Sequence, residues 1–178
     1  MRQATELLSQ YAQYHRDRRN IVTHFIGIPM IVFAVGVLLS RPGFELAGWH
    51  LTPAWLVFAP LALWYLTRGQ FMLGLAVSAG TALMLVLAQQ FTAASTTASW
   101  LAWGVGIFVV GWVFQFVGHY YEGRKPAFVD DIIGLAVGPM FVVAEWMFAI
   151  GWNKPLLHEI ERVAGPTLLR DLAHPARG

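Results

Sequence analysis

Apolar residues along this chain gather in long blocks that are separated by short polar stretches. Three blocks, residues 21–39, 71–91 and 100–118, have about the 20 residues that a helix needs to cross a bilayer. Two further blocks, residues 54–66 and 130–152, contain an internal proline, and the first is short for a full span. The pattern predicts an all-α membrane protein, a bundle of four to five transmembrane helices.

The connections between these blocks are short, and one block carries small residues suited to close packing. Residues 40–53 are expected to form a loop and residues 67–70 a tight turn. Within the block 71–91, small side chains at Gly74, Ser78 and Gly80 should let a neighbouring helix approach closely.

The first twenty residues follow a different pattern, that of an amphipathic helix at the membrane interface. Apolar side chains recur there at the spacing of one helix face, at Ala4, Leu7, Leu8 and Tyr11. His15 continues this face of a helix predicted over residues 4–17, so it should point inward rather than into water. Asn20 is expected to cap the helix that follows. A cleavable signal peptide is not expected, because these residues carry charges and no apolar core.

The basic residues suggest an orientation in the membrane. The positive-inside rule places the N-terminus, Arg68 and the segment 119–130 in the cytoplasm. A full last span would then put the basic tail outside, against the rule. We therefore expect the block 130–152, in which Gly138-Pro139 forms a kink or separates two half-helices, to re-enter the membrane and return the tail to the cytoplasm.

One integral membrane domain is therefore predicted for the whole chain. It comprises an interfacial helix over residues 4–20, a membrane bundle over residues 21–152 and an interfacial tail over residues 153–178.

Composition supports the membrane class and excludes several functions. The chain is 57% hydrophobic and 12% charged, whereas a soluble domain is typically about 25% charged. A net charge of +2 is too small to indicate a nucleic-acid partner. The absence of cysteine excludes disulfides, thiolate metal sites and cysteine nucleophiles. The Walker A, GxGxxG, GxSxG and HExxH motifs are absent, and six histidines without HxxxH or HxxHH clusters exclude the membrane di-iron desaturases and hydroxylases.

Three histidines lie near predicted ends of apolar blocks, at the depth of the membrane interface, where they could form a shared site. His15 and His24 are nine residues apart, which puts them on opposite faces of one straight helix, so they converge only if the chain bends at residues 16–20. The predicted topology brings His119 to the same cytoplasmic interface. The sequence therefore predicts that these three imidazoles form one metal site.

A carboxylate follows the third histidine at a spacing that suits a shared site. Gln115, His119 and Glu122 lie at i, i+4 and i+7, on one stripe of a helix. Histidine with a carboxylate three residues later is a spacing used by metal ligands on helices. Imidazoles with one carboxylate suit iron or zinc rather than calcium or magnesium, and an open-sided site of this kind suits non-haem iron(II).

Each of these residues also has a simpler interpretation. A single histidine near a helix end often makes only an interfacial hydrogen bond, and Glu122 is equally well suited to an ion pair with Arg124 or Lys125. Asp130 and Asp131 resemble helix caps, and Glu145 should face the protein interior because lipid exposure is costly. The side chains predicted to orient the ligands from behind are Gln115, Asn20, Asp131 and Glu145.

The basic residues near these motifs serve most simply as topology determinants, although they also suit a cationic rim that holds an acyl carboxylate. The residues predicted for this rim are Arg16, Arg19, Arg124 and Lys125. His50, His158 and His174 have no partner pattern and are expected at the surface. Two alternatives to an enzyme stay open: a haem-binding electron carrier with two axial histidines, and a small transporter or structural protein whose polar residues serve packing.

Three stretches resemble one known family. They are YAQYHRDRRNIVTHFIGIP (11–29), QFVGHYYEGRKPAFVDD (115–131) and GPMFVVAEWMFAIGW (138–152), and they are similar to the membrane-bound 2-hydroxy fatty acid dioxygenases. The resemblance implies an iron(II)-dependent dioxygenase that takes a long-chain 2-hydroxy fatty acid and molecular oxygen and shortens the acid by one carbon in α-oxidation.

The resemblance also assigns residues and a location. It gives His15, His24 and His119 the family's histidine positions and Glu122 its carboxylate. A short chain of this kind resembles the bacterial members, which implies the inner membrane, with the active site at the cytoplasmic face predicted above. The implied partners are the fatty acid, oxygen and the lipid bilayer, and a homo-oligomer is compatible with the sequence.

Overall fold

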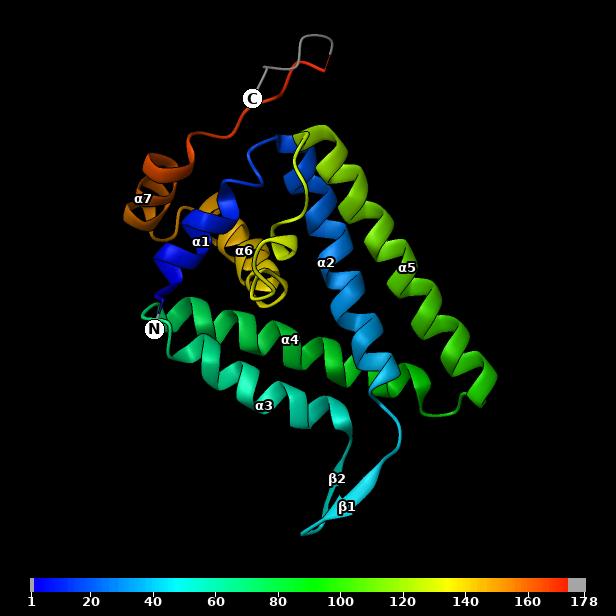
Figure 1. The fold of residues 1–178 in the computed structure, drawn as a ribbon. Coiled ribbons are helices and arrows are strands. Elements are labelled where there is room, and N and C mark those ends of the chain that lie inside the picture. Colours follow the sequence, from blue (N-terminus) through cyan, green and yellow to red (C-terminus); the bar gives the residue numbers. More distant parts are fainter. Residues whose placement is uncertain (1, 173–178) are drawn as a thin grey trace. The chain divides into compact units, whose positions relative to one another are not determined.

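The computed structural model describes residues 2–172, which form a helical protein with one small β-hairpin (Figure 1). In chain order the elements are α1 (Ala4–Ala12), α2 (Arg18–Leu38), β1 (Phe44–Leu46), β2 (Trp49–Leu51), α3 (Pro53–Leu66), α4 (Phe71–Thr92), α5 (Thr97–Glu122), the 3₁₀ turn η1 (Ala127–Val129), α6 (Gly134–Ala149) and α7 (Lys154–Ala164). The predicted all-α class is confirmed.

Among the described residues, three helices are long and apolar enough to cross a membrane: α2, α4 and α5. Large apolar side chains on all three are exposed, among them Ile26, Leu83 and Val109. This is the surface expected of helices whose solvent is lipid rather than water. The other two apolar helices, α3 and α6, have 14 and 16 residues, fewer than the roughly 20 of a full span.

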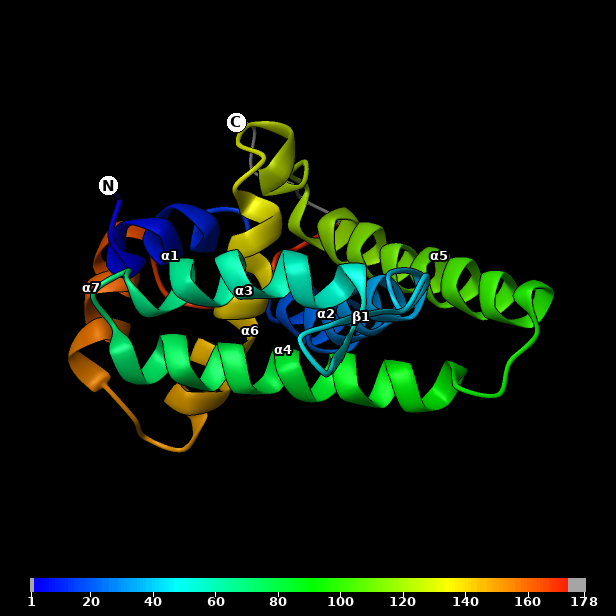
Figure 2. The same cartoon turned by 90° about the horizontal axis from the view of Figure 1, so that it is seen from below.

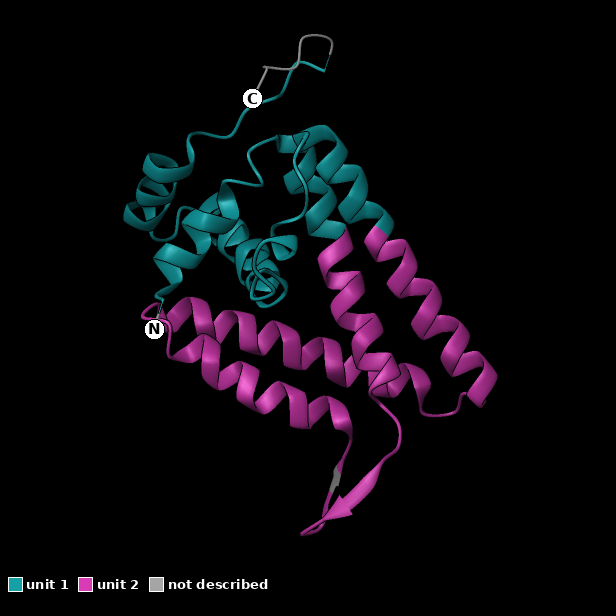
Figure 3. Cartoon of the chain, viewed as in Figure 1, with its two compact units in different colours: residues 1–26, 113–178 teal, residues 27–112 magenta. Residues whose placement is uncertain are grey.

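The chain divides into two compact units (Figure 3). Unit 1 comprises residues 1–26 and 113–178, and unit 2 comprises residues 27–112. The helices α2 and α5 contribute residues to both units. All residues of the candidate site described below belong to unit 1.

Unit 2 contains an antiparallel helix pair, α3 and α4, joined by the predicted turn at residues 67–70 (Figures 1 and 2). Gly74 permits their contact, because a Cβ added there would lie 2.5 Å from the carbonyl oxygen of Tyr65. A Cβ added to Gly80, on the same helix, would meet nothing within 4 Å. The close packing predicted at Gly80 is therefore not observed among the described residues.

The predicted loop at residues 40–53 contains a β-hairpin instead of irregular chain. The strands β1 and β2 pair antiparallel, with Leu46 opposite Trp49. The two residues between them, Ala47 and Gly48, both have positive φ, 52° and 80°. This is the backbone of a two-residue hairpin turn. Alanine adopts it so rarely that the residues 47–48 did not indicate a hairpin.

Unit 1 is built on α1, which packs against α6 and α7. The predicted apolar face of α1 is buried. The helix ends at Ala12, however, and α2 begins at Arg18 rather than residue 21. Asn20 therefore lies inside α2 and does not cap it, which corrects the prediction. The cap is Asp17, whose Oδ1 accepts the Arg19 N–H at 2.8 Å.

The last apolar block forms one helix, α6, and is not split into two half-helices at Gly138-Pro139. Proline is tolerated there because its missing N–H removes only a bond to the first turn of the helix. The helix begins at Gly134, so the predicted capping by Asp130 and Asp131 is wrong. Asp131 instead accepts the Ile133 N–H in the turn that precedes the helix.

The chain after α7 returns to the segment between α1 and α2. Leu168 N–H donates to Arg16 O, and Arg18 N–H donates to Leu168 O, each at 2.9 Å. The Arg170 N–H adds a bond to Asp17 Oδ2. We call residues 166–171 the C-terminal strap. Its position beside the N-terminal segment is what a tail returning to the same side of the membrane requires.

Replacing Gly74 by alanine should destabilise the protein, because the new methyl group would meet the Tyr65 backbone. Overpacking of this kind costs about 1–3 kcal/mol. Gly80→Ala is the matched control, and with open space around it should be neutral or stabilise by up to ~1 kcal/mol. Thermal unfolding in detergent compares the two variants, and equal midpoints would contradict the close contact.

Candidate metal centre

Three histidines from three separate segments of unit 1 meet at one buried point. His15 lies between α1 and α2, His24 lies in α2, and His119 lies in the last turn of α5. One ring nitrogen from each lies within 4.8 Å of the other two, and all three side chains are buried. The ring centroids are 4.5–5.1 Å apart.

The meeting of His15 and His24 depends on a break in the helix, as the sequence predicted. The break occurs at residues 13–17, slightly earlier than the predicted bend at 16–20, because residues 18–20 already belong to α2. His15 sits within the break, and this allows its ring to turn back toward α2.

Backbone carbonyls fix the protonation of two of the rings. His15 Nδ1 lies 2.7 Å from Tyr11 O, and His24 Nδ1 lies 2.9 Å from Asn20 O. A carbonyl oxygen only accepts, so Nδ1 carries the proton in each neutral ring and Nε2 carries a lone pair. The two Nε2 atoms are 3.0 Å apart. Two lone pairs at this distance repel each other unless a proton or a cation lies between them.

The third ring also has an unsatisfied nitrogen. His119 Nδ1 is buried and makes no hydrogen bond. A buried polar atom without a partner costs free energy that native structures usually avoid. A cation bound by all three rings would satisfy these nitrogens together, and a set of three imidazoles suits zinc, copper, iron or nickel. The residues present therefore fit a transition metal.

Aromatic side chains pack around His15 and exclude water. Tyr11 stacks on its ring, with centroids 4.0 Å apart and planes inclined by 6°, and Phe141 lies 5.4 Å away. Burial, and then the nearby rings of His24 and His119, hold the pKa of His15 well below its ordinary value. The ring is therefore neutral at physiological pH, the form that binds a metal.

Gly118 allows α5 to reach α2 at this point. A Cβ added to it would overlap Thr23 Oγ1 and Asn20 Oδ1 and would lie 3.2 Å from His24 Nδ1. Tyr11 was recognisable as the residue one helical turn before His15, whereas nothing in the sequence pointed to Phe141 or Gly118 as neighbours of the histidines.

Glu122 does not belong to the group of histidine nitrogens. Its two oxygens each accept the Arg16 N–H at 3.0 Å, and Oε2 also accepts the Asp17 N–H at 2.8 Å and Asn20 Nδ2 at 3.0 Å. The structure thus brings three of the four predicted ligands together, the histidines. The fourth, Glu122, accepts hydrogen bonds from N–H donors instead.

The alternative ion pair of Glu122 with its basic neighbours is also not the arrangement observed. Arg124 Nη1 donates to Gln13 O, and Lys125 pairs with Asp130. Asp130 in addition accepts the Tyr14 hydroxyl at 2.8 Å. These contacts attach the segment after α5 to the end of α1.

The four residues predicted to orient the ligands lie in three different settings. Asn20 and Glu145 adjoin the loop that carries His15, because Asn20 Nδ2 donates to Tyr14 O at 3.1 Å and Glu145 lies 3.8 Å from Arg16 Nη2. Gln115 is buried, and its Nε2 has no hydrogen-bond partner. Asp131 instead pairs with Arg2 at 2.6 Å, on a partly exposed part of the surface.

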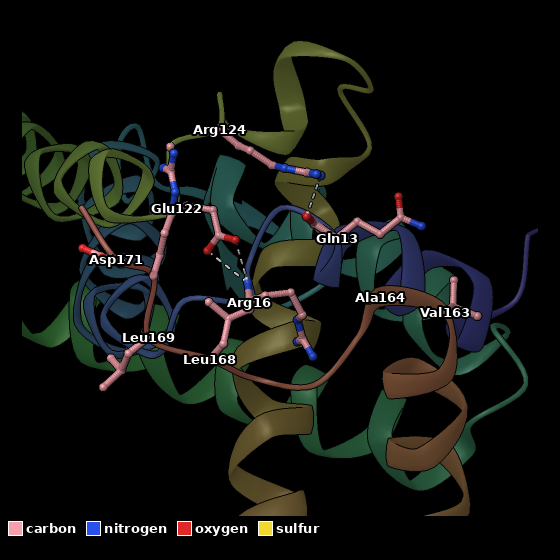
Figure 4. Close-up of a pocket in the computed structure, with 11 residues that line it drawn as sticks. Gln13, Arg16, Glu122, Arg124, Val163, Ala164, Leu168, Leu169 and Asp171 are labelled. Carbon is pink, nitrogen blue, oxygen red and sulfur yellow. Dashed lines mark hydrogen bonds between the residues drawn. The ribbon is translucent and has the colours of Figure 1, made fainter. Parts of the chain in front are cut away.

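A pocket of about 980 Å³ opens beside the loop that follows His15 (Figure 4). Arg16 and Arg124, two of the predicted rim residues, line it together with Arg170, and apolar side chains come from α7 and the C-terminal strap. Arg19 and Lys125 are not among its lining residues. The Arg19 guanidinium binds Asp17 and Arg170 O and lies over the Tyr121 ring.

The other three histidines of the sequence are His50, His158 and His174. His158 has an exposed side chain, as predicted. His174 lies outside the described residues, and the side chain of His50 is not described.

Comparison with known proteins gives two findings. Residues 1–150 match the family described as Mpo1-like, "2-hydroxy-palmitic acid dioxygenase Mpo1-like". The chain is also 31% identical over 159 residues to the 2-hydroxy-palmitic acid dioxygenase MPO1 of Saccharomyces cerevisiae, with 86% of this chain and 85% of that protein covered. No solved structure matches.

Substituting alanine for Gly118 should weaken metal binding, because the methyl group would displace Asn20 and His24 from α5. We expect a loss of about 10–100-fold in affinity for Co(II), the range seen when residues that support metal ligands are changed. Gly106→Ala, on the same helix, is the control, because a Cβ added at Gly106 meets nothing within 4 Å. Equal affinities in a competition titration would show that the close approach is unimportant.

Acidification should destabilise the metal-free protein. The unfolded chain binds a proton at His15 below about pH 6.5, whereas burial lowers the pKa of this ring in the folded chain. Stability is therefore complete above this pH and falls by about 1.4 kcal/mol per unit below it, until the folded ring also takes up its proton. Thermal unfolding with a chelator present should show this fall, and H15Q should reduce it. H158Q, at an exposed position, should leave the profile unchanged. A pH profile in H15Q as steep as that of the parent protein would contradict the assignment.

Proposed function

The chain belongs to the Mpo1-like family, and from this premise we propose that it is a non-haem iron(II) dioxygenase acting on long-chain 2-hydroxy fatty acids. The yeast relative is named for activity on 2-hydroxy-palmitic acid. The observation that carries the proposal is the group of three buried imidazoles whose free nitrogens converge without another partner.

Iron(II) is the metal we assign to His15, His24 and His119. The donor set alone also suits zinc, but zinc has no redox chemistry. When bound, iron(II) supplies the electron transfer with molecular oxygen that a dioxygenase requires. Three protein nitrogens would leave positions open for substrate and oxygen, as the two-histidine, one-carboxylate site of non-haem iron oxygenases does, with a third imidazole here in place of the carboxylate. The proposed product is a fatty acid one carbon shorter than the substrate.

The protein's own residues prepare the centre. The carbonyls of Tyr11 and Asn20 accept the Nδ1 protons of His15 and His24, respectively. The Nε2 atom of each of these two rings therefore presents its lone pair to the centre. Stacking of Tyr11 on His15 fixes that ring and keeps water from it. These contacts set ring orientation and protonation before any ligand arrives.

We assign the substrate carboxylate to Arg16 and Arg124, which line the 980 Å³ pocket. Arg16 supports this role because its Nη2 makes no hydrogen bond, with Glu145 Oε1 lying 3.8 Å from it. Arg19 and Lys125, also predicted for this role, neutralise Asp17 and Asp130. Leu168 and Leu169 offer apolar contact in the same pocket, where each buried CH₂ contributes about 0.8 kcal/mol.

The apolar exposed faces of α2, α4 and α5 support insertion in a lipid bilayer. We propose the bacterial inner membrane, with the histidine centre at the cytoplasmic face, because the basic residues near it follow the positive-inside rule.

The haem alternative is disfavoured by the geometry of the histidines. Two axial ligands bind on opposite faces of a porphyrin, which then lies between their nitrogens. The Nε2 atoms of His15 and His24 are 3.0 Å apart, which leaves too little space for a macrocycle between them. A purely structural role gives no account of three buried nitrogens that converge with their lone pairs unpaired.

The test is anaerobic reconstitution of the chelator-treated protein with iron(II), followed by oxygen and 2-hydroxypalmitate. We expect one iron per chain, no Soret band and a product one carbon shorter, with His119→Ala reducing turnover by more than about 100-fold. His158→Ala, which changes an exposed side chain, is the control. A Soret band would favour the haem carrier, and the absence of bound metal would favour a non-catalytic protein. Full activity of His119→Ala would exclude the proposed centre.

A further inference from the structure

Glu122 connects the segments that carry all three histidines. It is the last residue of α5, three residues after His119. Its carboxylate accepts the backbone N–H groups of Arg16 and Asp17, the two residues that directly follow His15. It also accepts Nδ2 of Asn20, whose backbone carbonyl binds His24 Nδ1. One side chain on the helix of His119 therefore contacts the loop that carries His15 and the residue whose carbonyl binds His24.

We propose that Glu122 is a positioning residue of the metal centre: it holds the loop bearing His15 and the first turn of α2 against the helix that carries His119. The inference rests on the metal site of the proposed function. It assigns Glu122 a task different from that of a fourth ligand, and it acts through the histidines rather than on the metal.

The local charges favour a carboxylate at this place. The N–H groups of Arg16 and Asp17 lie just before the start of α2, where the backbone of that helix presents its positive end. Glu122 stands at the opposite, negative end of α5, so its own helix does not favour it. The position is explained by α2 and by the three donors that converge on the two oxygens.

The number of donors explains why a carboxylate is needed and why it is not free to bind metal. An ionised carboxylate offers about four lone-pair sites and no hydrogen. Three donors occupy these sites with distances of 2.8–3.0 Å. Binding a metal through the same oxygens would release backbone N–H groups that have no other acceptor among the described residues. A glutamine has one oxygen only, and its amide N–H₂ would face these donors.

Other hydrogen bonds hold the same turn after His15. The C-terminal strap binds Arg16 O and Arg18 N–H from the other side of the same turn. Arg16 Nε also donates to Ala12 O and His15 O, at 2.9 and 3.0 Å. The turn after His15 is thus held by several bonds, and among the described residues only those of Glu122 connect it to the helix bearing His119.

The test compares wild type, Glu122→Gln and Glu159→Gln, each loaded with Co(II) after chelator treatment. Glu159 is a matched control, because it is a partly exposed helical glutamate that pairs with Arg162, three residues further along the same helix. Affinity is measured by competition titration, and the number of coordinated imidazoles by X-ray absorption. We expect three imidazoles in wild type and Glu159→Gln. Glu122→Gln should bind about 10–100-fold more weakly, with at least one imidazole fewer.

Two results would overturn the proposal. Unchanged affinity and imidazole count in Glu122→Gln would show that the carboxylate does not position the centre. Loss of a non-imidazole oxygen with all three imidazoles retained would show that Glu122 is itself a ligand. If Glu122→Gln fails to fold, Asn20→Ala replaces it. This variant removes one donor to the carboxylate, together with the bond from Asn20 Nδ2 to Tyr14 O. It should weaken Co(II) binding in the same direction, and unchanged binding overturns the proposal.

Failure of this inference can be distinguished from failure of the proposed function. A wild-type protein that binds one metal through three imidazoles but forms no shortened product contradicts the dioxygenase and leaves the role of Glu122 intact. A wild-type protein that binds no Co(II) overturns both.

Discussion

The Nε2 atoms of His15 and His24, 3.0 Å apart in a buried site, impose the requirement around which unit 1 is organised. Each ring has its Nδ1 occupied by a backbone carbonyl of its own segment, so the proton is not available at Nε2. The folded chain therefore holds two lone pairs against each other, with His119 Nδ1 also unpaired. An arrangement of this kind is unfavourable in an apolar interior unless a cation is present, and this ties the stability of unit 1 to its chemistry.

Much of the surrounding structure opposes that repulsion. Glu122 and the C-terminal strap hold the turn after His15 from two directions, and Tyr11 covers the ring itself. The Arg16 guanidinium donates to the backbone carbonyls of Ala12, His15 and Gly165. Burial lowers its pKa, while the nearby Glu145 and Glu122 act in the opposite sense. The guanidinium stays charged, as arginine does in proteins, and it lines the pocket to which we assign the substrate carboxylate.

The sequence allowed the fold class and the three histidines to be predicted because both depend on strong local signals. Apolar blocks of about 20 residues specify helices by length alone, and the charged residues between His15 and His24 marked the break that lets these rings converge. Helix ends were less accurate: Asp17 rather than Asn20 caps α2, because both residue types favour the position and tertiary bonds to Glu122 decide between them. The hairpin at Ala47-Gly48, the contact of Gly118 with α2 and the place of Phe141 depend on residues distant in sequence, for which a single chain gives no pattern.

The C-terminal strap has a practical consequence for handling the protein. The family match ends at residue 150, yet residues after α7 pair directly with the backbone beside His15. A pulling force applied to the chain beyond Asp171 is resisted first by the bonds of Leu168 and Arg170 to the 16–18 turn, before it reaches α7. A force applied through a surface anchor or tether at that end would therefore act on the turn beside His15 before it acts on α7.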